Sequence, residues 1–441
     1  MKDFITALDE RVDHILDACT RCGKCVEACP SATAAGIDKS DSAGLVAGVL
    51  DILRDGAGPA PAARWAEVCT GSGACIPACG YGINPRFMLA MARAAQRRHA
   101  VPPATVRADG IGHFQRMSRG VRILSRLQLP PDLMRRLGRT MESDRDVADP
   151  EIVFYTGCNI LRTPHIALLC LDVLDALGTR YAIYGGPSNC CGVLQLRGSD
   201  TETSGKVGYS TIERFAATGA CEVVAWCPSC MVQFGDIMLP TYQRSTGTDP
   251  FDMVPFTVWL AARLDALRPH LARPVHKRVG LHEHPGVPGV TEAVRTILEA
   301  IPGLEFVDLD QPRIGSMCNT LNALPDYKRA AHLAQLEAAE AAGVDTLAGI
   351  YHACHRELCS HERDWPFAVV NFMELIGESM GIARPDLFKR LKIMQDADTI
   401  LAESADMMAA YELDPAEVRT IVERDLLGEQ ALPLGSRRAA R

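Results

Sequence analysis

Five cysteines between residues 158 and 230 constrain this chain more than any other feature. They are Cys158, the adjacent pair Cys190 and Cys191 followed by a glycine, and the Cys-Pro-Ser-Cys segment of Cys227 and Cys230. The gaps are 31 residues before the pair and 35 residues after it. Two adjacent cysteines cannot easily bind the same face of a tetrahedral metal or of an ordinary cubane cluster. The spacing therefore predicts an unusual iron–sulfur site.

Composition narrows the classes of protein to which the chain could belong. It has 441 residues, of which 47% are hydrophobic and 23% charged, as in an ordinary globular protein of two or three domains. The formal net charge of -8 argues against nonspecific binding to nucleic acid. Neither a signal peptide nor a membrane-spanning apolar run is visible, so we expect a cytoplasmic protein without a membrane segment of its own. Thiols stay reduced there, and seventeen clustered cysteines then indicate metal or redox chemistry rather than disulfides.

The N-terminal region carries a run of cysteines with bacterial ferredoxin spacing, closed by Pro30: Cys19, Cys22, Cys25 and Cys29. A second run keeps the spacing but has serine at its second position: Cys69, Ser72, Cys75 and Cys79. In ferredoxins with two such runs, the fourth cysteine of each binds the other run's cluster. We therefore expect the first cluster, a ferredoxin-type 4Fe–4S cluster, on Cys19, Cys22, Cys25 and Cys79. The second would be held by Cys29, Cys69 and Cys75, with Ser72 at the open corner.

The serine leaves the nature of the second cluster open. It could be a 3Fe–4S cluster, which needs only three thiolates. It could be a 4Fe–4S cluster with the Ser72 oxygen or water as fourth ligand, or a cluster that loses iron easily. An oxygen donor is harder than thiolate and holds the fourth iron less well. A vestigial site is the alternative.

Hydrophobic patterns predict a helical N-terminal part and a repeated α/β part. Helices are expected over 1–18, 43–55 and 85–98, and an arginine-rich helical linker follows. Strands that each end near a cysteine are expected at 151–156, 181–184 and 222–226, with a helix over 165–177. The same order recurs with strands at 278–282, 304–309 and 346–351 and a helix over 291–300, which indicates an internal repeat. The predicted fold class is α+β, with a helical bacterial-ferredoxin-like domain (1–100), a basic helical linker (101–149), two repeated α/β domains (150–275 and 276–375) and a helical C-terminal extension (376–441).

These motifs resemble heterodisulfide reductase chains in which a ferredoxin-like part is fused to two cysteine-rich CCG domains, over about residues 10–370. The resemblance implies a noncubane 4Fe–4S cluster on the five cysteines, which would then be catalytic in reactions of a thiol or disulfide, free or protein-bound. A similar layout occurs in heterodisulfide reductase-like complexes of sulfur-oxidising bacteria. It also occurs in the iron–sulfur subunits of glycolate, lactate and anaerobic glycerol-3-phosphate dehydrogenases.

The second repeat departs from the five-cysteine pattern. His284 stands near the position of Cys158, one thiol of the adjacent pair is missing, Tyr351 replaces Cys227 and Cys354 matches Cys230. A Cys/His metal site is predicted on His284, Cys318 and Cys354, with His352, His355 or Cys359 as a fourth ligand. Its metal would be zinc or a further iron–sulfur cluster. The alternatives are a half that lost its metal and kept its fold, and a proton-transfer role for His352 or His355.

The predicted sites together indicate a function in electron transfer and sulfur chemistry. We expect an oxidoreductase subunit of a complex that carries electrons between ferredoxin-type clusters and a sulfur-handling site. The alternative is an electron-transfer subunit for a flavoprotein dehydrogenase. The chain has no Gly-x-Gly-x-x-Gly fingerprint, so flavin or another redox cofactor would belong to a partner subunit. A redox sensor with structural clusters is a third hypothesis. Arg162 and His165 are weak candidates for lining the Cys158 pocket, and Cys170 and Cys221 are expected in the core.

Overall fold

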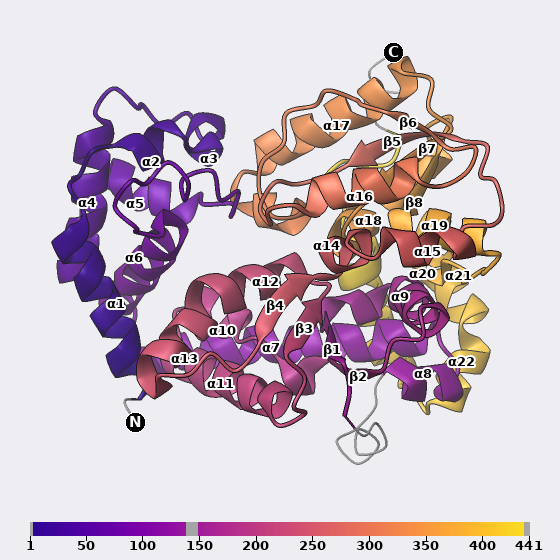
Figure 1. Cartoon of the computed structure of the whole chain (residues 1–441), viewed down its shortest axis with the longest axis horizontal. Coiled ribbons are helices and arrows are strands. Elements are labelled where there is room, and N and C mark those ends of the chain that lie inside the picture. The colour runs from indigo at the N-terminus through magenta and orange to yellow at the C-terminus, as the bar shows by residue number, and fades with distance from the viewer. Residues whose placement is uncertain (1–2, 138–148, 436–441) are drawn as a thin grey trace.

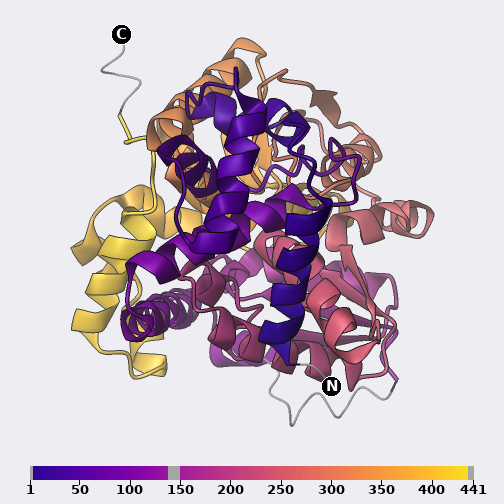
Figure 2. The same cartoon turned by 90° about the vertical axis from the view of Figure 1, so that its left-hand side faces the viewer.

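The structure is a computed structural model that describes residues 3–137 and 149–435. Part of the predicted linker (138–148) and the polar tail from Ser436 lie outside the described residues. A helical N-terminal part stands beside two α/β repeats, with its helices facing both of them (Figures 1 and 2). One continuous hydrophobic core extends from the N-terminal helices through both sheets.

Short helices and loops surround the two N-terminal cysteine runs. The bounds are α1 Phe4–Ala18, α2 Lys24–Glu27, α3 Pro30–Ala34, α4 Ser42–Asp55, α5 Ala60–Glu67 and α6 Pro85–Ala100. The three predicted helices are confirmed as α1, α4 and α6. Side chains cap the starts of α1 and α6: Asp3 accepts from the Thr6 N–H at 2.7 Å, and Asn84 accepts from the Phe87 N–H at 3.1 Å. These caps fix where the two helices that flank the cysteine loops begin.

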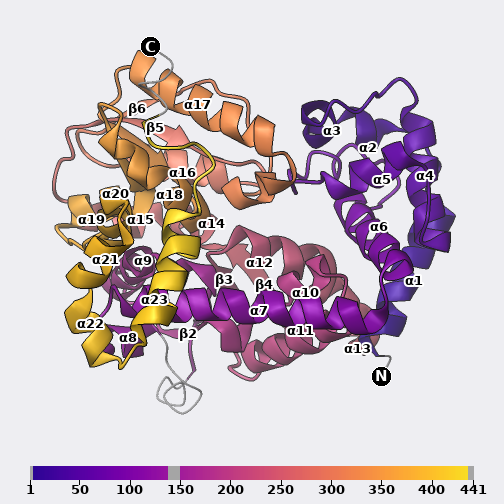
Figure 3. The same cartoon turned by 180° about the vertical axis from the view of Figure 1, so that it is seen from behind.

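The arginine-rich linker is helical, as predicted, and runs behind the first repeat (Figure 3). It forms α7 Pro103–Arg126 and α8 Pro131–Leu137. Two of its arginines form ion pairs within the chain: Arg122 pairs with Glu417 at 2.8 Å, and Arg136 pairs with Asp172 at 3.0 Å. The C-terminal helices pack on α7 and comprise α20 Leu387–Met394, α21 Ala397–Glu403, α22 Ala405–Ala410, α23 Pro415–Ile421 and the π-helical turn η8 Val422–Leu427.

The first repeat is a parallel sheet with the strand order β2-β1-β3-β4. Its strands are β1 Ile152–Gly157, β2 Tyr181–Gly185, β3 Glu222–Ala225 and β4 Asp252–Pro255. Its helices and turns are η2 Asn159–Arg162, α9 Pro164–Ala176, η3 Pro187–Asn189, α10 Val193–Arg197, α11 Thr201–Ala216, α12 Pro228–Gln233, η4 Phe234–Met238, α13 Leu239–Thr246, α14 Phe256–Ala261, α15 Leu264–Leu267 and η5 Arg268–His270. Every residue of β1 is buried, as expected for a parallel strand covered on both faces.

The second repeat has the same topology, with the order β6-β5-β7-β8. Its strands are β5 Arg278–His282, β6 Glu305–Val307, β7 Thr346–Gly349 and β8 Ala368–Asn371. Its helices are α16 Val290–Glu299, η6 Cys318–Ala323, α17 Pro325–Ala341, α18 His352–Leu358, η7 Cys359–Arg363 and α19 Phe372–Met380. The internal repeat and the six predicted strands are confirmed, to within about two residues at each end. The edge strands β4 and β8 were not predicted; β4 is only partly buried and ends in proline, which weakens the pattern of a strand.

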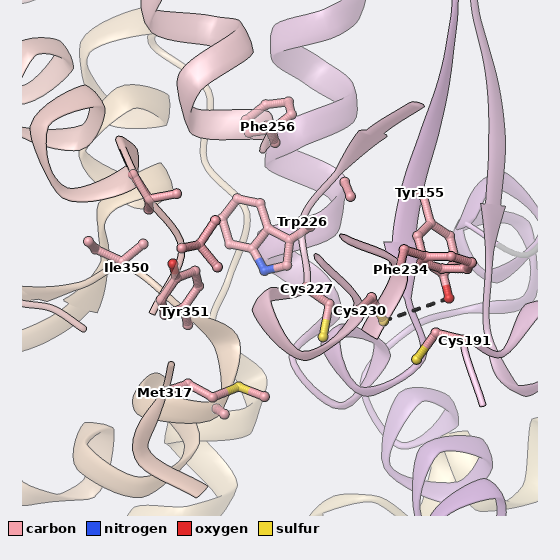
Figure 4. Packing of buried hydrophobic residues seen from close by; sticks show 14 of the residues in the cluster. Tyr155, Cys191, Trp226, Cys227, Cys230, Phe234, Phe256, Met317, Ile350 and Tyr351 are labelled. Atoms are coloured by element: carbon pink, nitrogen blue, oxygen red, sulfur yellow. Dashed lines mark hydrogen bonds between the residues drawn. The ribbon is translucent and has the colours of Figure 1, made fainter. Parts of the chain in front are cut away.

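Aromatic packing joins the two repeats. The rings of Trp226 and Phe372 stack with centroids 5.9 Å apart and an interplanar angle of 1°. Figure 4 shows Trp226 and Tyr351 where the repeats meet, with Cys227 and Cys230 close by. The ends of β3 and β7 therefore face one shared interior.

Candidate iron–sulfur centres

The structure brings the four predicted ligands of the first ferredoxin-type centre together. One cavity is lined by Cys19, Cys22, Cys25 and Cys79. Burial and the neighbouring Cys19 and Cys22 thiolates raise the pKa of Cys25 to about 12. Such a set cannot ionise fully without a bound cation, and iron supplies that charge.

The remaining N-terminal cysteines form a second group, the second ferredoxin-type centre. Burial and the charges of Cys69 and Cys29 raise the pKa of Cys75, so these three thiols are close neighbours. The Trp65 indole N–H donates a hydrogen bond to the Cys29 sulfur at 3.4 Å. Hydrogen bonds to cluster sulfurs tune reduction potentials, so this indole, which the sequence did not single out, would tune a cluster bound at Cys29.

The hydroxyl group of Ser72 has partners of its own. Its oxygen accepts from the Gly315 N–H at 2.6 Å and lies 3.1 Å from the Thr70 hydroxyl. Ser316 N–H also donates to the Thr70 carbonyl at 3.2 Å. The second cysteine run is therefore fastened to the loop before η6 of the second repeat, and Ser72 has a structural role besides the predicted one at the open corner.

The five-cysteine site (Cys158, Cys190, Cys191, Cys227 and Cys230) lies at the carboxyl edge of the first sheet. All five cysteines are buried. Their thiols form a chain of contacts: Cys158 with Cys190, Cys190 with Cys191, Cys191 with Cys230, and Cys230 with Cys227. Cys158 follows β1, the adjacent pair follows β2, and the last two residues lie at the start of α12 after β3. In open parallel sheets, ligands bind at this carboxyl edge, at the point where the connections after two neighbouring strands, here β1 and β3, cross to opposite faces of the sheet.

Protonation in this site is uneven. The hydrogen bond to Cys190, together with burial, raises the pKa of Cys158 well above its ordinary value. The pKa of Cys190 is lowered, because its sulfur accepts from Cys158 and Cys191. Five thiolates could therefore exist together only beside strong positive charge, which an iron cluster provides. The thiol chemistry fits the predicted cluster.

The glycine after the cysteine pair is required by the backbone. Gly192 has φ +79°, and a Cβ built there would lie 2.5 Å from the Ser204 carbonyl oxygen. Only glycine fits this left-handed, crowded position. Its N–H donates to the Cys190 sulfur at 3.4 Å. The Cys-Cys-Gly sequence thus turns both thiols inward.

Polar neighbours of the five-cysteine site were not found from the sequence. Tyr155 donates its hydroxyl hydrogen to the Asn189 carbonyl at 2.8 Å and accepts from the Cys230 thiol at 3.7 Å. Asn159 donates its side-chain N–H to the Cys158 sulfur at 3.8 Å. Arg162 was only a weak candidate for this pocket; its guanidinium group pairs with Glu429 at 2.9 Å.

A cavity of about 230 Å³ separates the second ferredoxin-type centre from α12. Its lining includes Cys69 on one side and Ser229 and Gln233 on the other. Three arginines also line it: Arg86, Arg93 and Arg197. The lining also includes the carboxylates of Glu67 and of Asp236, which pairs with Arg86, so the cavity between these two candidate redox sites has a small excess of positive charge.

The second repeat gathers four buried metal-binding side chains, here called the His/Cys cluster: His282, His284, Cys318 and Cys354. Their donor atoms all lie within 4.8 Å of one another. The Cys318 sulfur is 3.1 Å from Nε2 of His282 and 3.5 Å from Nε2 of His284. Nδ1 of His284 lies 2.7 Å from the Ile314 carbonyl, which accepts its proton and leaves Nε2 free as a ligand.

The fourth member of this cluster differs from the prediction. It is His282 rather than His352, His355 or Cys359. The strand register of the two sheets gives the reason. In the first repeat, Ile152 of β1 pairs with Glu222 at the start of β3; in the second, Val279 of β5 pairs with Thr346 at the start of β7. Three residues further along each strand, His282 therefore occupies the position that Tyr155 has in the first repeat. Comparing the registers of the two repeats would have found it. Of the two cysteines expected in the core, Cys170 is buried as expected, whereas Cys221 is exposed, contrary to expectation.

Comparisons with known proteins agree with this arrangement. Residues 12–33 match the 4Fe-4S binding domain family, and residues 152–235 match the cysteine-rich domain family, CCG. One subunit of the dihydromethanophenazine:CoB–CoM heterodisulfide reductase from Methanosarcina barkeri is 26% identical over 404 residues, covering 83% of this chain and 95% of that protein. The Methanosarcina mazei protein of the same name is 24% identical, with 83% and 94% coverage. The chain is a heterodisulfide reductase-like iron–sulfur protein.

A shorter similarity reaches another reductase. One subunit of the fumarate reductase (CoM/CoB) from Methanothermobacter marburgensis is 28% identical over 175 residues, covering 38% of the heterodisulfide reductase-like chain and 32% of that protein. No solved structure matches significantly. Within 3–137 and 149–435, no helix is both long and apolar enough to cross a membrane.

Proposed function

We propose that this chain is the oxidoreductase subunit of a complex, carrying electrons between two ferredoxin-type clusters and a noncubane 4Fe–4S cluster on the five-cysteine site. At that site a disulfide or thiol would react. The convergence of five buried thiols at the carboxyl edge of the first sheet carries the proposal. The similarity to the Methanosarcina heterodisulfide reductase proteins over 83% of the chain supports the sulfur chemistry.

Residues around the five-cysteine site would position and tune the bound group. A noncubane cluster, when bound, supplies iron that accepts a sulfur ligand and transfers single electrons. Tyr155 holds the Cys230 side, and the N–H of Gly192 neutralises part of the charge on Cys190. Burial excludes water from the thiols, which strengthens each of these interactions.

The arginine-lined cavity supports electron transfer and substrate access in the same region. It extends from Cys69, in the second ferredoxin-type centre, to α12, whose first turn carries Cys227 and Cys230. Its arginines would offset the negative charge of thiolates and attract an anionic sulfur compound.

A second candidate function is a relay for a separate flavoprotein. The similarity to one subunit of the fumarate reductase (CoM/CoB) favours it, because the name of that enzyme includes a substrate, fumarate, that is not a sulfur compound. In both versions, flavin or another redox cofactor would lie on a partner subunit.

We also propose that the His/Cys cluster binds zinc. Two imidazole nitrogens and two thiolates form a set typical of closed, tetrahedral structural zinc sites, and all four residues are buried. His284 already has the fixed tautomer that such a ligand needs. Zinc content that falls by one atom per chain in the double variant Cys318→Ser/Cys354→Ser would support this assignment, and unchanged content would refute it.

Low-temperature electron paramagnetic resonance on the anaerobically purified chain tests the main proposal, with iron counted on the same sample. A new signal should follow oxidation in the presence of CoM or glutathione thiols. Cys191→Ser should abolish that signal and leave the ferredoxin-type clusters reducible. Cys170→Ala, a change at a buried cysteine outside the site, should keep it.

Two results would contradict the proposal. A thiol-dependent signal that survives in Cys191→Ser would place the chemistry elsewhere. Reducible clusters that respond to no sulfur compound, together with copurification of a flavoprotein, would favour the relay.

A further inference from the structure

A second cluster of metal-binding side chains, in which both histidines are buried and both carboxylates half-buried, joins the two repeats. It lies apart from the cysteine sites and is here called the His/carboxylate cluster: His165, His355, Glu374 and Asp386. His165 belongs to α9 of the first repeat, whereas His355 and Glu374 belong to α18 and α19 of the second. Asp386 is the N-cap of α20. We propose that these four side chains hold one structural zinc ion that connects the repeats.

The donor atoms are close enough for one ion. All four lie within 4.8 Å of one another. Nε2 of His165 is 3.7 Å from a Glu374 oxygen, and its Nδ1 is 3.6 Å from an Asp386 oxygen. Tetrahedral zinc with bonds of about 2.0–2.1 Å places its ligands roughly 3.3 Å apart. The His355–Asp386 hydrogen bond of 2.7 Å would widen by roughly half an ångström to meet that geometry.

His165 is the observation that points to a ligand. Its side chain is 3% exposed, and neither ring nitrogen has a hydrogen-bond partner among the described residues. A buried imidazole whose nitrogens reach carboxylates only at 3.6–3.7 Å, beyond hydrogen-bond distance, is costly, so its position between Glu374 and Asp386 needs an explanation. A cation held by one ring nitrogen and both carboxylates would leave the other ring nitrogen as an N–H donor toward the carboxylate that it faces.

His361 provides the contrast. It is equally buried, and its two ring nitrogens also lack partners in the described part of the chain. Burial lowers the pKa of His361 to about 4. Burial also lowers the pKa of His165, but Asp386 and Glu374 together raise it above the ordinary value. Of these two histidines, His165 alone therefore lies in a field that attracts positive charge.

Hydrogen bonds orient both carboxylates. One Asp386 oxygen accepts from the Lys389 backbone N–H at 2.9 Å, and one Glu374 oxygen accepts from the Asn371 N–H at 2.7 Å. The ammonium group of Lys389, the nearest lysine charge, donates to Glu362 at 2.8 Å and to the Val369 carbonyl at 3.1 Å. Metal ligands are commonly held by such outer contacts.

The donor set distinguishes this site from the others in the chain. Two imidazoles and two carboxylates contain no thiolate, so iron–sulfur clusters are not suited to it. Two buried histidines and two half-buried carboxylates offer four donors between helices, the number that a structural zinc site uses. Because the His/Cys cluster has two sulfurs, the two zinc environments are separable by spectroscopy.

The test uses the full chain, purified anaerobically, with zinc, manganese and iron counted by mass spectrometry and zinc K-edge X-ray absorption. His165→Gln should lower zinc by one atom per chain and leave iron unchanged. The matched control, His361→Gln, should lose no metal. Equal zinc in the wild type and in His165→Gln, with iron retained, would overturn the proposal, as would manganese or non-cluster iron lost in place of zinc.

A second variant decides the question if His165→Gln fails to fold. Cys318→Ser/Cys354→Ser removes the sulfur ligands of the His/Cys cluster and leaves the His/carboxylate cluster intact. Retained zinc with only nitrogen and oxygen neighbours would support the proposal. A chain that keeps its iron but contains no zinc would refute it.

Discussion

Arg86 should contribute more to the stability of this chain than its exposed arginines do. Its guanidinium group pairs with both oxygens of Asp236 and donates to the carbonyls of Gly71 at 3.0 Å and Gly286 at 2.8 Å. These contacts tie the second cysteine run to both repeats. The side chains of Arg86 and Asp236 are only 11% and 9% exposed. The pair is therefore held where solvent screens it poorly.

Removing this arginine leaves a buried carboxylate without its partner. Arg86→Met should lower the free energy of unfolding by about 3–5 kcal/mol, the usual cost of breaking a buried pair. Arg86→Lys keeps the charge but cannot reach the carboxylate and two carbonyls at once, so we expect roughly half that loss. Anaerobic urea unfolding followed by circular dichroism measures both. Electron paramagnetic resonance on the same samples reports whether the clusters remain.

Arg122 supplies the matched control. Its pair with Glu417 also joins distant parts of the chain, but the two side chains are 43% and 32% exposed. Arg122→Met should therefore cost under about 1 kcal/mol. Equal losses for Arg86→Met and Arg122→Met would refute the reasoning, because burial would then not decide the strength of these pairs.

Two further predictions concern single side chains. Trp65→Phe removes the N–H that stabilises negative charge on the Cys29 sulfur. The reduction potential of the second ferredoxin-type centre should therefore fall by roughly 50 mV, the equivalent of ~1 kcal/mol. A redox titration measures this change and should find the potential of the first centre unchanged. His361 has an ordinary pKa of 6.5 and a folded-state pKa of about 4, so the unfolded chain binds the proton first as the pH falls. The contribution of the neutral ring to the free energy of unfolding is present above about pH 6.5 and is lost as the pH falls toward 4. Between about pH 6.5 and 5.5, the free energy of unfolding should therefore fall by about 1 kcal/mol more in the wild type than in His361→Gln. Urea unfolding midpoints at the two pH values measure this difference.

Much of the fold was readable from local patterns. Strands β1, β2 and β3 are short apolar runs that end near cysteines, and cysteine spacing grouped the residues that the structure brings together in the N-terminal centres and in the five-cysteine site. His282 escaped notice because it ends a predicted strand, where its side chain has no local signal; only register across the repeats gives it a role. His165 was considered for the Cys158 pocket, yet it lies between Glu374 and Asp386, which are far away in the sequence. Contacts at that separation depend on how the repeats pack, which no sequence window records.

The exchange of cysteines between the two N-terminal runs has a consequence for assembly. Cys79 lies with the first run, and Cys29 lies beside Cys69 and Cys75 of the second. Each bound cluster would thus close a loop of dozens of residues and act as a covalent cross-link between α1–α3 and α5–α6. The full set of predicted ligands would therefore exist only after synthesis through residue 79 for the first centre and through residue 75 for the second. Loss of iron from one centre would then loosen the segment that holds the other.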